Sequence, residues 1–332
     1  MDLGRLKALH AVATYGTVLA ASEALHCTPS AVSQQLAKLD RETGTRLLER
    51  DGRGLRLTAA GRLLADHAAR VLDAVDEARS ALAAYHQEVM GEIGVAAFAT
   101  ACRGLLPPAL ATLTTRHPRL TARVVEMNPY EAVDALTRGG NSGGDRATRI
   151  ARSRGPERDL LGPARVEVAV LDDWPEVSLD LPAGVAHTAL GDDRADLIVP
   201  SGHPLAGAGP VPLARAAGER WIGSTPGTIC HEWLLRVLPG VRPQYLVGEF
   251  ETQQRFVAAG LGVALIPRLA RMRTVPGTVV VPVTPAPARR VIVAWRKSTE
   301  VRPALGAAVA ALREAWADRD TATAFDTATA SG

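Results

Sequence analysis

The chain of 332 residues has only three cysteines, Cys27, Cys102 and Cys230, which are odd in number and widely spaced. This pattern argues against a disulfide framework and is typical of buried free thiols in a reducing cytosol. The formal net charge is only +3, so charge alone indicates no particular partner. Aromatic residues are few, at 4% of the chain.

Long hydrophobic runs are also absent. Asp2, Arg5, Lys7 and His10 interrupt the first apolar stretch, so no secretion signal is recognised. No window approaches the roughly 18 consecutive apolar residues that a membrane span requires. We therefore expect a cytoplasmic protein with no membrane partner.

The sequence shows no catalytic constellation. Its eight histidines have no metal-ligand spacing, and His231-Glu232 lacks the partner histidine of a zinc helix. A phosphate-binding glycine loop and a Gly-x-Ser-x-Gly elbow are both missing. Cys230 beside His231 leaves open a thiol nucleophile, or a redox sensor together with Cys102. The main prediction is a protein that is not an enzyme and uses neither cofactor nor metal.

What is present is the composition of a soluble globular protein, with 47% hydrophobic and 22% charged residues. The length favours two or more domains. Near the N-terminus, apolar periodicity predicts a helix over residues 3–15 and a second over 18–26 capped by Thr17. Thr28 as N-cap, Pro29 at the first helical position and Gly44 as terminator predict a third helix.

The third helix has two different faces. Val32, Leu36 and Leu39 form one apolar stripe. The other face carries side chains that can bind phosphates or read base edges, glutamine pairing most naturally with adenine. The DNA-binding candidates here are Thr28, Pro29, Ser30, Ser33, Gln34 and Lys38. A turn between two short helices suits insertion into the major groove, and the alternative is a three-helix core with a solvated face.

Residues 49–57 predict two short strands around a glycine turn, which is a wing. Arg50, Arg53 and Arg56, with Asp51 as the one acid at the tip, would place positive charge where phosphate or minor-groove contact could use it.

Thr58 then caps a long helix, predicted to run to about residue 88. Its apolar residues are spaced alternately by four and three, as in heptad positions a and d. They are Leu64, Ala68, Val71, Val75, Ala78, Leu82 and Tyr85. A second copy of the chain is the simplest partner, and packing against the chain's own C-terminal domain is the alternative. A dimer would read a near-palindromic site in double-stranded DNA.

Three segments resemble the N-terminal signature of the LysR-type transcriptional regulators: residues 20–26 (AASEALH), 28–36 (TPSAVSQQL) and 57–61 (LTAAG). The resemblance implies a winged helix-turn-helix over 1–58, a dimerising linker helix over 59–89 and a two-lobed α/β effector domain like a periplasmic binding protein. It also implies a homodimer or homotetramer. By position, Ser33 and Gln34 would contact bases, and Arg53 would belong to the wing. Many family members have a basic residue where Gln34 stands.

From residue 91 the pattern alternates between strands and helices, which predicts an α/β domain. Strands are expected at 93–99, 121–127, 166–171, 196–200, 220–223, 244–248, 262–267, 278–282 and 290–295. Helices are expected at 105–116, 130–138, 211–217, 231–238, 252–259 and 303–318. Segments 106–108 (LPP), 200–205 (PSGHPL) and 257–267 (VAAGLGVALIP) resemble the family's effector-binding region.

The resemblance implies one lobe from residues 90–171 and 268–317 and a second from 172–267, with crossovers near Asp172 and Pro267 and a cleft for a small-molecule effector between the lobes. Ligands in such folds favour strand ends and helix N-termini. The effector-binding candidates are Thr100, Ala101, Ser201, His203, Ser224, Thr225, Thr228 and Glu251, with Phe250 and Thr252 in the wall. Helix capping or turn formation is the alternative role for each.

Residues 141–165 look inserted relative to the family, with six arginines and three acids, and predict a mobile basic loop near the cleft, a subunit contact or DNA. Residues 318–332 are expected to be a disordered tail. In this interpretation, an effector shifts the packing of subunits and thereby changes DNA bending and contact with RNA polymerase. The rivals are a transport solute-binding protein and a molybdate-responsive regulator, whose C-terminal part would be small β-barrels.

Overall fold

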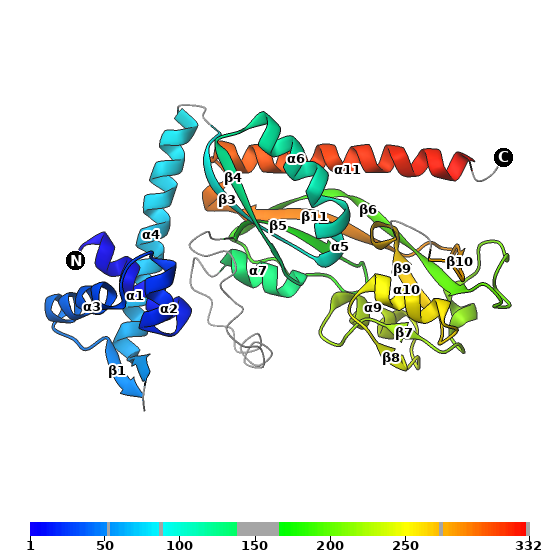
Figure 1. The fold of residues 1–332 in the computed structure, drawn as a ribbon, viewed down its shortest axis with the longest axis horizontal. Coiled ribbons are helices and arrows are strands. Elements are labelled where there is room, and N and C mark those ends of the chain that lie inside the picture. Colours follow the sequence, from blue (N-terminus) through cyan, green and yellow to red (C-terminus); the bar gives the residue numbers. More distant parts are fainter. Residues whose placement is uncertain (52–53, 86–88, 138–165, 272–274, 330–332) are drawn as a thin grey trace.

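The computed structural model describes residues 1–51, 54–85, 89–137, 166–271 and 275–329, arranged as a winged domain, a long helix and a two-lobed α/β domain (Figure 1). The predicted insertion at 141–165 lies outside the described residues. Over the described part of the chain, no helix is long and apolar enough to cross a membrane.

The helices of the winged domain begin and end close to the capping residues that the sequence predicts. Helix α1 (Leu3–Tyr15) ends where Gly16 adopts φ of 76°, and α3 (Pro29–Thr43) ends at Gly44 with φ of 64°. Helix α2 (Val18–Ala24) is shorter than predicted, because Leu25 is already its C-cap and His26 adopts a positive φ of 51°. The three helices share one apolar core with the first turns of α4 (Ala59–Tyr85).

A short hairpin follows α3. Strands β1 (Leu48–Asp51) and β2 (Gly54–Leu57) are antiparallel, with Glu49 opposite Arg56 and Arg50 opposite Leu55. The predicted wing is therefore present.

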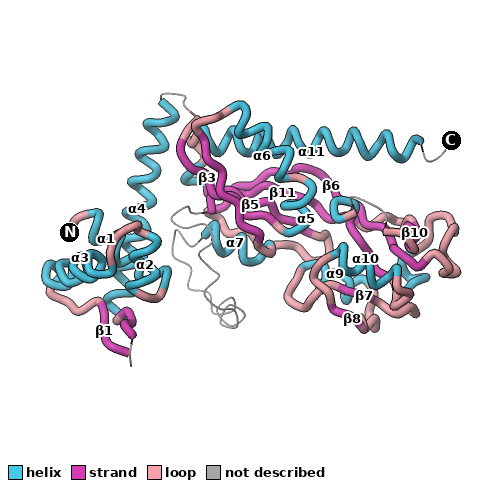
Figure 2. Tube along the Cα trace, viewed as in Figure 1, coloured by secondary structure: helices cyan, strands magenta, loops and turns pink. Residues whose placement is uncertain are grey.

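One sheet, with strand order β10-β6-β11-β5-β3-β4, runs through both lobes (Figure 2). Strands β3 (Gly91–Ala97), β4 (Leu120–Glu126) and β5 (Val166–Asp173) are parallel. Strand β11 (Ala288–Arg296) runs antiparallel between β5 and the first part of β6 (Val185–Pro200). These strands make up the sheet of lobe 1. Its helices are α5 (Ala99–Gly104), α6 (Leu106–Arg116), α7 (Pro129–Thr137) and α11 (Pro303–Thr329).

Lobe 2 is built on the end of β6, which pairs with β9 (Ala264–Pro267) and β10 (Thr278–Val281). Strands β7 (Ile222–Gly223) and β8 (Tyr245–Leu246) form a separate pair. Helices α9 (Ile229–Val237) and α10 (Phe250–Ala258) complete the lobe, with 3₁₀ turns η2 (Leu213–Ala216), η3 (Arg268–Ala270) and, in lobe 1, η4 (Lys297–Thr299).

The chain passes between the lobes at more places than the two predicted crossovers near Asp172 and Pro267, where Trp174 already packs in the core of lobe 2 and Leu269 in that of lobe 1. Strand β6 itself carries the chain from lobe 1 into lobe 2, because residues 185–194 pair with β11 and residues 195–200 pair with β9 and β10. Strand β10 also belongs to lobe 2, so the chain returns to lobe 1 between residues 282 and 288. The predicted disordered tail is wrong over residues 318–329, because α11 continues to Thr329.

Candidate nucleic-acid interface and ligand pocket

The two faces of α3 are separated as the sequence predicts. Val32, Leu36 and Leu39 are buried, at 1%, 4% and 0% exposure. Ser30, Ser33, Gln34 and Lys38 are exposed, and so are Thr28 and Pro29 at the start of the helix. The Thr28 hydroxyl oxygen accepts the amide hydrogen of Ala31 at 3.2 Å, which makes it an N-cap. The helix therefore presents an unobstructed polar face.

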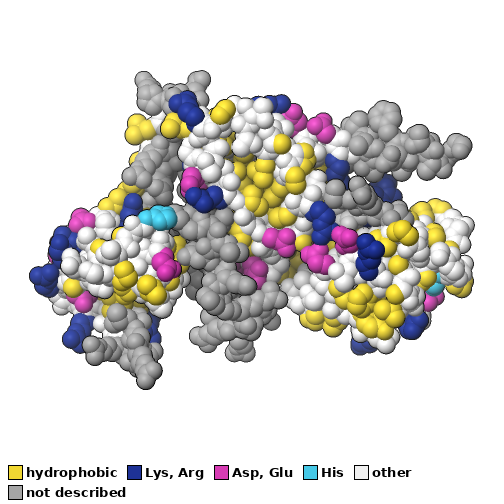
Figure 3. All heavy atoms as spheres, in the orientation of Figure 1, with side chains coloured by type: hydrophobic (Ala, Val, Ile, Leu, Met, Phe, Trp, Pro, Cys, Tyr) yellow, Lys and Arg dark blue, Asp and Glu magenta, His cyan; other side chains and the backbone are white. Residues whose placement is uncertain are grey.

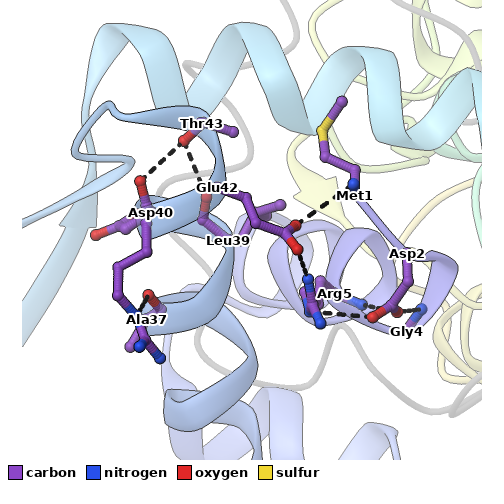
Figure 4. Close-up of polar contacts among 10 residues, drawn as sticks. Met1, Asp2, Gly4, Arg5, Ala37, Leu39, Asp40, Glu42 and Thr43 are labelled. Atoms are coloured by element: carbon purple, nitrogen blue, oxygen red, sulfur yellow. Dashed lines mark hydrogen bonds and ion pairs between the residues drawn. The ribbon is translucent and has the colours of Figure 1, made fainter.

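Ion pairs fix the far end of α3 against α1 (Figure 4). Glu42 pairs with the Arg5 guanidinium and lies 3.4 Å from the Met1 amine. Asp40 accepts the Leu47 amide hydrogen at 3.1 Å and so ties α3 to the start of the wing. These contacts hold the helix and wing in one orientation.

A basic surface hollow lies beside the polar face, lined by Arg5, Lys38, Arg41 and Glu42. Lys38 and Arg41 stand four and seven residues after Gln34 and so continue its face of the helix. Figure 3 shows lysine and arginine side chains gathered at the end of the winged domain where α3 lies. Arg41 was missed by the sequence analysis, although its helical spacing from Gln34 indicates it.

The wing carries less free charge than its arginines suggest. Arg56 is exposed but pairs with Glu49 across the hairpin, at 2.7 Å. Arg50 lies on β1, and Arg53 lies outside the described residues.

The predicted seam on α4 divides into two parts. Ala68 is 1% exposed and Leu64 packs against the core of the winged domain, where α1 contacts α4. These first turns of α4 therefore complete the fold of the winged domain, and contact of the two residues with a partner stays a prediction. Further along, Val71 and Leu82 are 43% and 64% exposed, Ala78 is exposed and Val75 is half-buried. Tyr85 is the last residue of the helix.

A buried ionic cluster joins the strands that connect the lobes. Arg289 on β11 is 1% exposed. Its guanidinium nitrogens lie 3.2 Å from Asp172 and 2.9 Å from Asp193, and Nη2 donates to the Thr100 hydroxyl at 2.8 Å. Burial raises the pKa of Asp172, and attraction to Arg289 offsets this only in part. Burial alone lowers the pKa of Arg289, but the two aspartates raise it overall.

Two polar contacts join the lobes at the surface. Arg103 of α5 pairs with Glu249 at 2.6 Å, and the Tyr130 hydroxyl of α7 donates to Glu232 of α9 at 3.0 Å. Burial, together with that hydrogen bond, raises the pKa of Tyr130 to about 12, so the hydroxyl stays protonated near neutral pH.

The eight effector-binding candidates have different surroundings. Ala101 is buried in the core of lobe 1, and Thr100 is held by Arg289. Ser201 and Glu251 are exposed, and Glu251 lies 3.9 Å from Arg255. His203 accepts the Leu205 amide hydrogen within a turn and lies 3.3 Å from Glu219. Thr228 caps α9 and donates to the Thr225 carbonyl, which leaves Ser224 as the candidate that lines a pocket.

That pocket is a small hollow in lobe 2. It is lined by Trp174, Ile222, Gly223, Ser224, Cys230, Trp233, Leu234, Phe250, Gln253, Leu265 and Pro267. Phe250 was expected in a wall, whereas Trp174, Trp233 and Gln253 were missed. They come from three separate segments, so no local motif could have grouped them.

The three cysteines are free thiols. Cys27 is exposed, which corrects the expectation that it is buried. Burial raises the pKa of the Cys102 thiol to about 11 and that of the half-buried Cys230 thiol to about 12. Among the described residues, no group of three or more histidine, cysteine or acidic side chains could hold a metal ion.

Comparison with known families decides what this architecture is. Residues 3–62 match the model of the bacterial regulatory helix-turn-helix of the lysR family, and residues 86–140 and 158–317 match the LysR substrate binding domain. The chain is a LysR-type transcriptional regulator. The match skips residues 141–157, which lie within the predicted insertion. LysR-type proteins are bacterial transcriptional regulators with a helix-turn-helix rather than enzymes.

Two curated relatives of this LysR-type regulator come from mycobacteria. The chain is 32% identical over 210 residues to a probable hydrogen peroxide-inducible genes activator of Mycobacterium xenopi, covering 63% of the chain and 95% of the relative. It is 28% identical over 303 residues to the protein of the same description from Mycobacterium leprae, covering 89% and 88%.

Solved full-length regulators share the fold. A full-length OxyR variant from Pseudomonas aeruginosa superposes with a TM-score of 0.68 at 22% identity, covering 95% of this chain and 94% of that one. Full-length CbnR in complex with its target DNA gives a TM-score of 0.56 at 21% identity, covering 95% and 100%.

Proposed function

We propose that this LysR-type regulator binds a near-palindromic promoter site in double-stranded DNA as a homodimer or homotetramer. A small molecule in the effector domain changes DNA bending and contact with RNA polymerase. The observation that carries the proposal is the face of α3, where Ser33, Gln34 and Lys38 are exposed over a fully buried apolar stripe.

Within this proposal the side chains of the winged domain divide into two roles. Ser33 and Gln34 read base edges in the major groove, since glutamine can make a bidentate pair with adenine. Phosphates are contacted by Thr28 and Ser30, which flank Pro29 at the helix start, by Lys38 and Arg41, and by Arg50, Arg53 and Arg56 of the wing. Because Arg56 already pairs with Glu49, it exchanges that partner for a phosphate on binding.

Oligomerisation uses the exposed part of α4. Val71, Val75, Ala78 and Leu82 are spaced by four, three and four residues, which places them on one face of the helix. An exposed leucine and valine on such a face gain free energy when a second copy covers them. Each dimer then presents two copies of α3 to the two halves of the site.

The effector binds without covalent chemistry, in contrast to the response to hydrogen peroxide for which the mycobacterial relatives are named. A thiol attacks peroxide as the thiolate. Burial raises the pKa of Cys230 to about 12, and Asp172 adds to the rise, so the thiol stays protonated near neutral pH. Binding of an effector without covalent chemistry fits these groups better.

The test is DNA binding by the full chain, first by mapping its bound sites across the genome and then by titration on the consensus. Gln34→Ala is expected to cost about 1–3 kcal/mol of binding free energy at one base position and to relax the preference there. Arg53→Ala is expected to weaken binding to all sequences and to lower the salt dependence by about one phosphate contact. Wild-type binding by both variants would refute these assignments.

A further inference from the structure

Turn η3 (Arg268–Ala270) packs in both lobes. The strands on either side of it in the chain, β9 and β10, pair with the end of β6 in lobe 2. Ala270 packs in a core cluster of lobe 2, together with residues of β9 and α10. The residue before it, Leu269, is 3% exposed and packs in the core of lobe 1. A segment of lobe 2 therefore places one side chain inside the other lobe.

The part of lobe 1 that receives Leu269 fits it closely. Helix α5 ends at Gly104 beside it, and a Cβ added to Gly104 would lie 3.0 Å from the Leu269 Cδ1 atom and 3.4 Å from the Leu269 carbonyl oxygen. The Leu269 amide donates to the buried Asp193 carboxylate at 2.8 Å. Because protein cores are close-packed, withdrawing Leu269 would leave a cavity and would take one donor from a buried carboxylate. Both effects hold the turn in lobe 1.

Ion pairs hold the same turn to lobe 2. Asp196 is 2% exposed and lies in the part of β6 that pairs with β9. Its carboxylate accepts from Arg268 Nε at 3.0 Å and from Arg271 Nη2 at 2.6 Å. Charge-assisted hydrogen bonds to a buried carboxylate are directional, so the backbone between the two arginines cannot rotate without breaking one of them. Leu269 lies in that backbone segment.

The surface contacts between the lobes are weaker than the contacts of η3. Arg103 and Glu249 are 32% and 48% exposed, and pairs of this kind contribute little to stability. The hydrogen bond from Tyr130 to Glu232 is also exposed to solvent. Both contacts can break and re-form while Leu269 stays in the core of lobe 1. The position of lobe 2 on lobe 1 therefore depends on η3 more than on these contacts.

We infer that turn η3 fixes lobe 2 to lobe 1, so that the effector domain moves as one rigid unit and its lobes do not open and close. The consequence for regulation rests on the proposed function: the small molecule alters DNA bending by shifting whole effector domains against each other. Leu269 is the residue that positions the lobes, and Gly104 leaves the space that Leu269 needs.

The experiment measures the distance between the lobes in the full chain. Spin labels are attached through Thr115→Cys on α6 in lobe 1 and Arg255→Cys on α10 in lobe 2, two exposed positions, after the three native cysteines are replaced by alanine. Labelled chains are mixed with an excess of unlabelled chains, so that distances within one chain dominate. One narrow distance is expected, unchanged when DNA is added. Two distances, or a distance that shifts with DNA, would overturn the inference.

Leu269→Ala is expected to add a second distance or to broaden the first, because the turn no longer holds lobe 2. Leu305→Ala is the matched control: Leu305 is also 3% exposed in the core of lobe 1, but it comes from α11 of the same lobe. It should lower the urea midpoint to a similar extent and leave the distance unchanged. Leu269→Met keeps the volume and should retain the single distance. An unchanged distance in Leu269→Ala, or equal broadening in both alanine variants, would overturn the role of the turn.

A second pair of variants tests the same contact with Leu269 in place, in case the Leu269→Ala protein does not fold. Gly104→Ala puts a methyl group against Leu269 and is expected to shift the distance between the lobes. Gly306→Ala on α11 is the control, because a Cβ there meets no described atom of a neighbouring element within 4 Å. If Gly104→Ala kept the wild-type distance, the fit of Leu269 in lobe 1 would not control the position of the lobes.

DNA titration of the unlabelled chain separates this inference from the proposed function. If the chain binds its mapped DNA sites and its lobes show two distances, the inference fails alone. If the distances behave as expected and the chain does not bind DNA, the proposed function fails and the role of η3 stands.

Discussion

The winged domain and the effector domain hold their candidate functional side chains in opposite ways. On α3 the candidates are exposed and come from one helix, and the apolar stripe behind them carries the fold. In the effector domain, Thr100, Asp172 and Arg289 are buried and come from segments far apart in the sequence. Function and stability should therefore be separable by substitution in the first region and coupled in the second.

The strongest test of the coupled region is Arg289→Leu. The substitution leaves Asp172 buried without its counter-charge and Asp193 with Arg319 alone, 4.0 Å away, which is expected to cost about 3–5 kcal/mol of unfolding free energy. All five tryptophans lie in the effector domain, so their fluorescence during urea unfolding reports on that domain. Arg116→Ala, which removes an exposed pair with Glu314, is the control and should cost less than about 1 kcal/mol. Similar costs for the two variants would contradict the role given to burial.

A smaller effect is expected from Thr100→Val, which keeps the shape of the side chain and removes its hydroxyl. One donor of the buried Arg289 then has no acceptor, at a cost of about 1–3 kcal/mol. In the control Thr137→Val, the lost hydroxyl bonds to two carbonyls of its own helix, and about 0.5 kcal/mol or less is expected. Urea unfolding again compares the two variants. If Thr100→Val were as stable as the control, the Thr100 hydroxyl would not contribute to the stability of the effector domain.

The difference between the regions also explains what could be predicted from the sequence. Thr28, Pro29 and Gly44 act on the backbone beside them, so the limits of α3 follow from local chemistry. Residues 191–194 look like a turn, yet they continue β6, because Asp193 is neutralised by Arg289 and Gly191 gives space to Trp316. A Cβ at Gly191 would lie 2.4 Å from the Trp316 Nε1 atom. Neither partner is near in sequence.

The pocket escaped prediction for a related reason. Ser201, His203 and Thr228 were predicted as ligand contacts because they lie at strand ends or helix starts. In the structure they lie in turns or cap a helix. The lining instead depends on Trp174 packing against α9, 59 positions before Trp233. Tertiary packing determines such a contact, and no residue spacing in the sequence predicts it.

Helix α4 combines the features of the two regions, because its apolar residues are exposed in one part of the helix and buried in the other. Leu82→Glu is expected to raise the Kd of the dimer by about tenfold or more, which corresponds to about 1.4 kcal/mol. Sedimentation equilibrium measures the change. Leu19→Glu is the control, since Leu19 is 61% exposed on α2, away from the proposed seam, and its dimer should match the wild type. Equal dimer constants for both variants would place the interface elsewhere.

The smallest effect on stability is expected on the exposed face of α3 itself. Gln34→Ala removes an exposed side chain and places a good helix former there, so unfolding free energy should change by no more than about 0.5 kcal/mol. Leu36→Ala, two residues along the same helix, removes a 4% exposed side chain and should cost about 2–5 kcal/mol. Circular dichroism of the thermal transition compares the two, because the winged domain has no tryptophan. If Gln34→Ala destabilised the domain as much as Leu36→Ala, its loss of DNA affinity would report unfolding rather than a lost base contact, and the separation of function from stability in this domain would fail.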